Sequence, residues 1–107
     1  MQEGFQLTFY TQQDRLRGTE PLAHWLLMQA RQLGLRGATV SAAVEGFGHD
    51  GQLHQANMFD LSSQPVQITM IVSEAEMTRL FRVLEQEEVA LFYTRQAIEF
   101  GTAGVHP

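Results

Sequence analysis

Several segments of the chain alternate apolar with polar residues, the period-two pattern that is typical of strands with one buried face. Residues 5–10 show the alternation most clearly, and it returns in residues 38–45 and 66–72. A run of β-forming residues from 91 to 100 indicates a further strand. The pattern therefore predicts four main strands.

A first amphipathic helix is predicted between the first two strands. Its apolar residues recur at spacings of three and four and form one stripe: Leu22, Trp25, Leu26, Ala30 and Leu33. Thr19 is expected to cap this helix, with Glu20 and Pro21 in its first turn, where both residue types are favoured. Gly34 follows the stripe and predicts a left-handed stop.

A second helix is predicted between the third and fourth strands. Ser73 and Glu76 have the spacing of a capping box, in which the serine hydroxyl accepts a backbone N–H and the glutamate reaches back. The apolar stripe of this helix follows at i, i+3, i+4 and i+7: Met77, Leu80, Phe81 and Leu84. The acidic run at 85–88 is expected to be a solvated helix end.

The predicted element order is β-α-β-β-α-β. With right-handed crossovers, this order gives an α+β, ferredoxin-like sandwich in which a four-stranded antiparallel sheet carries both helices on one face. The helices should cover the more apolar face: Phe5, Phe9, Val40, Val44, Ile68 and Val72. The other face carries small or half-polar residues: Thr8, Tyr10, Thr39, Ser41, Ala43, Thr69 and Ile71. Packing against another sheet and exposure to solvent both fit such a face.

Length and composition narrow the class of protein. With 107 residues, of which 44% are hydrophobic and 18% charged, residues 1–107 are expected to form one domain, with a flexible tail at 101–107. A cytoplasmic protein without membrane insertion is expected, because no stretch approaches the roughly 20 apolar residues of a membrane span. The net charge of -5 argues against nucleic acid as a partner.

The sequence offers no catalytic residues. It has no cysteine and no lysine, which excludes thiol nucleophiles and Schiff-base chemistry. No Ser/His/Asp pattern or nucleophile elbow is present. The chain is therefore expected not to be an enzyme. In the polar loop at 11–18, Asp14 and Arg15 could form a surface ion pair or hold a ligand.

The connection at 46–65 is long for a hairpin, whose loops usually have about 2–5 residues. Its glycines match G-x-G-x-x-G, but no helical stripe follows, so the dinucleotide fingerprint is not satisfied. The glycines fit a plain turn or a close backbone approach to an anion. We expect this segment to be the most mobile internal one without ligand. His49 and His54 could bind a metal, although no third ligand is obvious.

Five short motifs occur in order along the chain: Asp14-Arg15-x-x-Gly18-x-x-Pro21-Leu22, Leu33-Gly34-Leu35-x-Gly37-Ala38-Thr39-Val40, Gly46-Phe47-Gly48, His54 and Pro65-Val66. In order and spacing they resemble the small PII-like proteins classed as domain of unknown function 190, in the superfamily of nitrogen regulatory PII and copper-tolerance proteins. The resemblance covers about residues 5–95.

This resemblance implies a ferredoxin-like homotrimer that binds a small anionic or nucleotide ligand in clefts between subunits. It implies a non-enzymatic signalling role, in which the loop at 46–65 docks on a partner protein, a transporter or an enzyme. A nucleotide is the one candidate cofactor, although the lysine and arginine residues that hold ATP phosphates in PII proteins have no match here. The ligand-binding residues implied by the motifs, together with the loop arginine, are Gly46, Phe47, Gly48, His54 and Arg15.

Two alternatives remain open at this point. His54 either contacts the ligand or fixes the long connection as a structural histidine. The whole protein could instead be a divalent-metal-binding or metal-tolerance trimer, similar to the copper-tolerance proteins, which would use His49 and His54.

Overall fold

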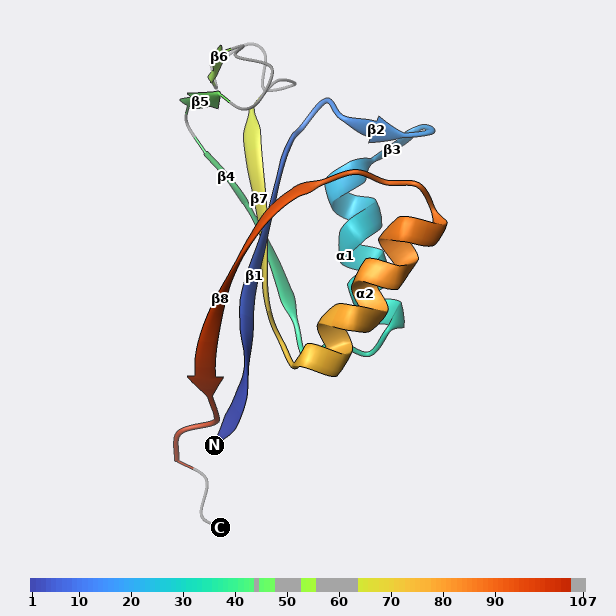
Figure 1. The fold of residues 1–107 in the computed structure, drawn as a ribbon. Coiled ribbons are helices and arrows are strands. Elements are labelled where there is room, and N and C mark those ends of the chain that lie inside the picture. Colours follow the sequence, from blue (N-terminus) through green and yellow to red (C-terminus); the bar gives the residue numbers. More distant parts are fainter. Residues whose placement is uncertain (44, 48–52, 56–63, 105–107) are drawn as a thin grey trace.

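The computed structural model describes residues 1–43, 45–47, 53–55 and 64–104. Its main sheet contains four strands: β1 (Gln2–Gln12), β4 (Ala38–Ala42), β7 (Pro65–Val72) and β8 (Phe92–Phe100). Two helices pack on one face of this sheet: α1 (Leu22–Gln32) and α2 (Glu74–Gln86) (Figure 1). Two short strand pairs complete the described elements: β2 (Leu16–Arg17) with β3 (Glu20–Pro21), and β5 (Glu45–Phe47) with β6 (Leu53–Gln55).

The main sheet has the order β4-β7-β1-β8, and every neighbouring pair is antiparallel. The two crossovers run through the helices, which lie side by side over the same face (Figure 1). The prediction of an α+β ferredoxin-like sandwich is therefore confirmed.

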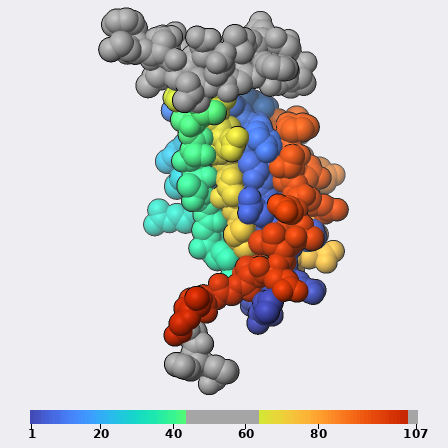
Figure 2. All heavy atoms as spheres, turned by 90° about the vertical axis from the view of Figure 1, so that its left-hand side faces the viewer, coloured from blue at the N-terminus to red at the C-terminus, as the bar shows by residue number. Residues whose placement is uncertain are grey.

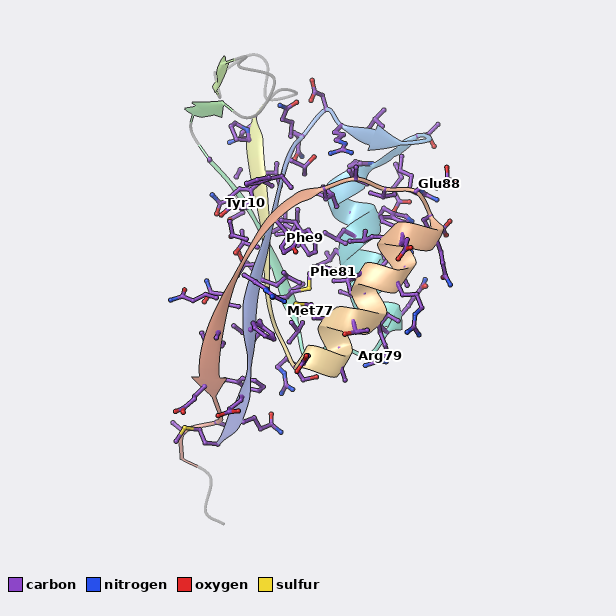
Figure 3. The ribbon with its side chains drawn as sticks, viewed as in Figure 1. Phe9, Tyr10, Met77, Arg79, Phe81 and Glu88 are labelled. Atoms are coloured by element: carbon purple, nitrogen blue, oxygen red, sulfur yellow. The ribbon has the colours of Figure 1, made fainter. Side chains whose placement is uncertain are left out.

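The core lies between this face and the helices. In β1, Leu7 and Phe9 are fully buried, and the register places Phe9 opposite Ile68 and Tyr93. Figure 3 shows Phe9 and Phe81 facing one another between the sheet and α2, with ring centroids 6.3 Å apart. Full burial of such side chains stabilises the fold by about 1.5–3 kcal/mol each.

The predicted division of the sheet into two faces is confirmed where the structure describes it. Val40 pairs with Ile68 and so lies on the helix-covered face, but it is 41% exposed because β4 is an edge strand. Val44, which was assigned to the same face, lies outside the described residues.

The predicted start of α1 is wrong. Thr19 is not its cap, because Arg17 pairs with Glu20 and Leu16 with Pro21, which leaves Gly18 and Thr19 as a two-residue hairpin loop. Gly18 has a φ of 64°, which suits this turn. Pro21 occupies the N-cap position of α1, and no side chain caps it. Hairpin pairing has replaced the extra helical turn that the sequence pattern predicts.

The predicted start of α2 is confirmed. The Glu76 N–H donates to the Ser73 hydroxyl at 3.2 Å, and the Ser73 N–H donates to the Glu76 carboxylate at 2.8 Å. This is the reciprocal capping box that the sequence predicts.

The long connection between β4 and β7 contains the paired strands β5 and β6. We call this strand pair the arm. The connection is therefore not an irregular loop throughout. The mobility expected for residues 46–65 falls largely on residues 48–52 and 56–63, which lie outside the described part of the chain.

Candidate ligand site at the arm end of the sheet

One end of the main sheet, which we call the arm end, brings together the segments that carry the predicted site residues. The arm rises there from β4 and β7 (Figure 1), and its base is closed by the Ala43 N–H, which donates to the Pro65 carbonyl at 2.8 Å. β1 ends at the same place, where the Gln13 N–H donates to the Gln64 carbonyl at 2.9 Å. The turn that follows β1 therefore starts beside the arm.

Within the arm, strand pairing brings three predicted site residues together. Gly46 lies opposite His54, and Phe47 lies opposite Leu53. Residues eight positions apart are thus neighbours across two strands. Gly48 lies outside the described residues.

The metal alternative depends on His49, which also lies outside the described residues. Among residues 1–43, 45–47, 53–55 and 64–104, no group of three His, Asp or Glu is arranged to hold an ion. The second histidine of the alternative, His54, is placed by its backbone in β6.

Arg15 lies in the turn between β1 and β2, on a different segment from the arm. Its guanidinium donates to the carbonyl of Ala90 at 2.6 Å, and its side chain is exposed. Ala90 belongs to the turn between α2 and β8, so Arg15 links two turns that are remote in sequence. A planar guanidinium fork of this kind is also suited to bind an oxyanion.

Arg17 is a neighbouring residue that sequence reasoning missed. It donates to the carbonyl of Glu87 at 3.1 Å and to the carboxylate of Glu87 at 3.2 Å. Its guanidinium also lies over the Trp25 ring, 4.6 Å from the centroid. The Arg15-x-Arg17 spacing was the available signal, because residues two apart in an extended segment project to the same side.

The sheet face opposite the helices is uncovered by any described element, and Figure 2 shows it directly. A row of threonines crosses all four strands at matched register: Thr39, Thr69, Thr8 and Thr94. The next row towards the arm end is Ser41, Gln67, Tyr10 and Phe92. The row on the other side contains Ile71, Gln6 and Gln96. No charged residue occupies these three rows.

Side-chain contacts order parts of this open face. The hydroxyls of Thr8 and Thr69 are 3.3 Å apart, and those of Tyr10 and Thr94 are 3.2 Å apart. The Tyr10 and Phe92 rings lie with their centroids 5.7 Å apart, yet Phe92 remains 68% exposed. A large exposed aromatic ring on a face without charges is typical of surfaces that a partner covers.

The ferredoxin-like fold, with the arm between its two βαβ halves, is similar to the fold of PII-like proteins. The chain belongs to the DUF190 family, described as "Uncharacterized ACR", whose model matches residues 4–99. A relative in sequence is the UPF0166 protein of Aquifex aeolicus (strain VF5), which is 31% identical over 80 residues, covering 74% of this chain and 76% of the relative.

Two solved structures are similar in fold. A PII-like signaling protein of Thermus thermophilus, named as putative, matches with a TM-score of 0.64 and 20% identity, covering 92% of this chain and 91% of that one. CPII, a nitrogen regulatory PII-like protein of Thiomonas intermedia K12 bound to ADP, AMP and bicarbonate, matches with a TM-score of 0.67 and 17% identity, covering 94% and 91%. Among the described residues of this chain, no helix is long and apolar enough to cross a bilayer.

Proposed function

We propose that this chain is a non-enzymatic, cytoplasmic regulator that works as a homotrimer. It binds a small anionic or nucleotide ligand in the clefts between subunits, and it docks on a partner protein through residues 46–65. Its membership of the DUF190 family and its PII-like fold support this proposal. So does the ligand set of the similar CPII structure, which contains two adenine nucleotides and bicarbonate.

The observation that carries the proposal is the charge-free open face of the sheet. The chain has 19 charged residues, counted as 7 basic and 12 acidic, but the three central rows of this face contain none. Charged residues are depleted in the cores of protein interfaces, whereas a face exposed to water normally carries them. A second copy of the chain is the simplest occupant for a face of this composition.

In the proposed trimer, the ligand site adjoins the subunit interface at the arm end. The open face continues up to the base of the arm, where Gln12 and Pro65 form the last pair of β1 and β7 on this face. A subunit packed on the open face would therefore border the arm and the turn that holds Arg15. A guanidinium beside an intersubunit cleft suits the phosphate of a nucleotide or a bicarbonate ion.

Light scattering at micromolar concentration tests the assembly, with three times the monomer mass as the expected result. A monomer would remove both the trimer and any site between subunits. A Thr94→Arg substitution puts a charge in the threonine row at an exposed position of the open face and should dissociate the assembly. Thr78→Arg, at an exposed position of α2, is the matched control.

Calorimetric titration with AMP, ADP, ATP and bicarbonate tests the ligand class. Arg15→Ala and His54→Ala should each weaken the affinity for the ligand that binds, while Arg31→Ala, at an exposed site on α1, should not. If His54→Ala lowers the melting temperature and leaves the affinity unchanged, His54 is a structural residue of the arm. Absence of binding by all four probes would contradict the proposed ligand class.

A further inference from the structure

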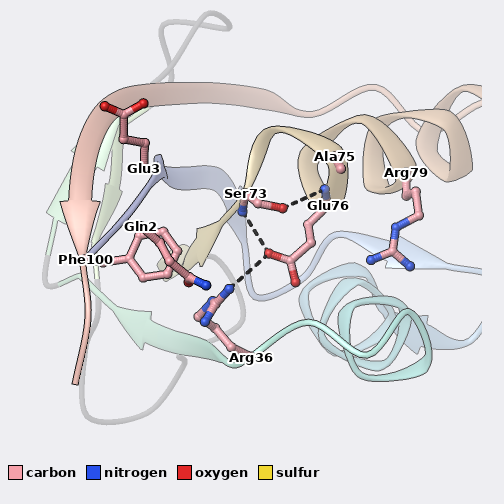
Figure 4. Close-up of a pocket in the computed structure, with 8 residues that line it drawn as sticks. All are labelled: Gln2, Glu3, Arg36, Ser73, Ala75, Glu76, Arg79 and Phe100. Atoms are coloured by element: carbon pink, nitrogen blue, oxygen red, sulfur yellow. Dashed lines mark hydrogen bonds and ion pairs between the residues drawn. The ribbon is translucent and has the colours of Figure 1, made fainter. Parts of the chain in front are cut away.

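A depression of about 550 Å³ lies at the end of the sheet opposite the arm. Figure 4 shows that β1 starts there, β8 ends there and α2 begins there. The residues that matter for its chemistry are Glu3, Arg36, Ser73, Glu76, Arg79 and Phe100. Because they come from separate parts of the chain, this depression is a product of the tertiary fold.

Arg36, in the connection between α1 and β4, is held in position on two sides. Its guanidinium lies over the Phe100 ring, 4.4 Å from the centroid, and donates to the Glu76 carboxylate at 3.5 Å. Its side chain is nevertheless 43% exposed. A guanidinium has five N–H donors, and the bond to Glu76 is the single hydrogen bond of this one within the described residues. Most N–H donors of this pre-oriented guanidinium therefore face the depression.

Glu76 orients Arg36 and is itself held in place, because the same carboxylate oxygen also accepts the Ser73 N–H at 2.8 Å. Burial raises the pKa of Glu76, but the hydrogen bonds from the Ser73 backbone and hydroxyl, together with the charge of Arg36, outweigh burial and leave that pKa lowered. The carboxylate thus stays ionised at neutral pH and keeps the guanidinium in place.

Arg79, one helical turn after Glu76, supplies a second cation. Its guanidinium donates to the Leu33 carbonyl at 3.2 Å through one nitrogen. Figure 4 shows Arg36 and Arg79 on either side of Glu76, and it shows the Glu3 carboxylate directed away from Arg36. With Glu3 turned away, the two guanidinium groups outnumber the one carboxylate between them.

From this arrangement we propose that the depression binds a small oxyanion, a phosphate or carboxylate group, through the guanidinium groups of Arg36 and Arg79. Two half-fixed arginines are well suited to this task, because a planar fork loses little freedom when it binds an oxyanion in bidentate geometry. The bound anion would connect the segment between α1 and β4 to the first turns of α2. The site is separate from the arm end and does not depend on the function proposed there.

Nuclear magnetic resonance titration of the isotope-labelled full chain tests the site. Sodium phosphate and sodium succinate are the two probes, each added at constant ionic strength and pH. The expected result is a saturable shift of the amide signals of residues 36 and 73–79. Saturation by phosphate alone identifies a phosphate site, and saturation by succinate alone identifies a carboxylate site. Absence of saturation with both probes overturns the proposal.

Single substitutions assign the binding to the two arginines. Arg36→Gln and Arg79→Gln should each weaken the saturating probe at least fivefold, whereas Arg82→Gln, at an exposed position of the same helix, should leave the affinity unchanged. Equal affinities in all four proteins would overturn the assignment. If Arg36→Gln does not fold, Arg79→Gln decides the test. The Arg79 side chain has one described hydrogen bond, an exposed one to the Leu33 carbonyl, so its loss should leave the fold intact.

Discussion

The two helices resemble one another at their C-termini and differ in the residue that makes this end possible. After α1, the Gly34 N–H donates to the Arg31 carbonyl and the Leu35 N–H to the Ala30 carbonyl, both at 3.1 Å. This is the Schellman pattern, and Gly34 adopts it with a φ of 74°. Glycine suits the position because it has no Cβ to clash in the left-handed region.

After α2, the same two bonds form around a glutamate. The Glu88 N–H donates to the Glu85 carbonyl at 3.2 Å and the Val89 N–H to the Leu84 carbonyl at 2.9 Å. Glu88 has a φ of 55°, which is uncommon for a residue with a side chain. Figure 3 shows it at the end of α2. An equivalent backbone turn has therefore formed without the residue that favours it.

At the N-termini, the local signal belongs to the other helix. α2 begins with a reciprocal capping box, whereas no side chain caps α1. Each helix thus has one end encoded by local residues and one end that needs help from elsewhere. The comparison shows that a helix boundary in this fold can be set either by local sequence or by tertiary contacts.

The hairpin of β2 and β3 supports both of the weaker ends. At α1, the Arg15 carbonyl accepts the Leu22 N–H at 2.9 Å. At α2, Arg17 donates to the Glu87 carbonyl and carboxylate. The last turn of α2 carries acidic rather than basic side chains, so Arg17 provides the positive charge that the helix dipole favours there.

Removing this tertiary support should have the largest effect. Arg17→Ala should lower the free energy of unfolding by about 2 kcal/mol, because it removes a charge-assisted bond to a carbonyl, an ion pair and the contact with Trp25. Urea unfolding measures the loss, with exposed Arg82→Ala as the control. Equal stability of the two variants would show that the hairpin does not support α2.

Removing the local signal of α2 should have the next largest effect. Ser73→Ala should cost about 1 kcal/mol, because the Glu76 N–H loses its partner at the N-terminus. Thermal unfolding measures the change, and Thr78→Ala, in the second turn, serves as the control for the loss of a hydroxyl. A loss for Ser73→Ala no larger than for the control would contradict the role of the cap.

The cost of Ser73→Ala should also depend on pH. The folded-state pKa of Glu76 is lowered from 4.5, so its ionised form stabilises the protein above that value. This contribution is lost as the pH falls through the lowered folded-state pKa. The difference between wild type and Ser73→Ala should therefore be constant near pH 7 and shrink below about pH 4.5. A difference that stays constant down to pH 2 would rule out a contribution from Glu76.

Substitution of the left-handed residue after each helix tests the comparison of the C-termini directly. Gly34→Ala should destabilise the protein by about 1 kcal/mol, because the left-handed backbone is costly for alanine. This cost exceeds the smaller stabilisation that comes from a less free unfolded chain. A Cβ at Gly34 meets nothing within 4 Å, so the cost comes from the backbone alone. Denaturant midpoints report the change, and an unchanged midpoint would contradict the backbone argument.

The smallest effect, with the opposite sign, is expected at the equivalent position of α2. Glu88→Gly should raise the free energy of unfolding by about 0.5 kcal/mol, because relief of the left-handed strain exceeds the added freedom of the unfolded chain. The Glu88→Gln variant removes the charge and keeps the Cβ. If Glu88→Gln stabilises as much as Glu88→Gly, charge repulsion rather than backbone strain is the cause.

Sequence reasoning was most successful where one element carries its own signal. The period-two segments at 5–10 and 66–72, the two apolar stripes, Gly34 and the capping box were confirmed, and the segment at 38–45 was confirmed for residues 38–42. The α+β ferredoxin-like class followed from their order. For the candidate site, the glycines and His54 were expected in one connection, and strand pairing places Gly46 opposite His54. The role of these residues toward a ligand stays a prediction.

The sequence by itself determined the four main strands, the two helices and which face of the main sheet is buried, but not the short strand pairs β2–β3 and β5–β6. These properties depend on residues up to about four positions apart, whose side chains share a face and whose backbone groups bond locally. Only the tertiary structure decided the start of α1, the left-handed end at Glu88 and the depression at Arg36. Arg17 and Glu87 are 70 positions apart, and Arg15 and Ala90 are 75 apart. No local pattern contains both partners of such a contact, because the fold alone brings them within hydrogen-bond distance.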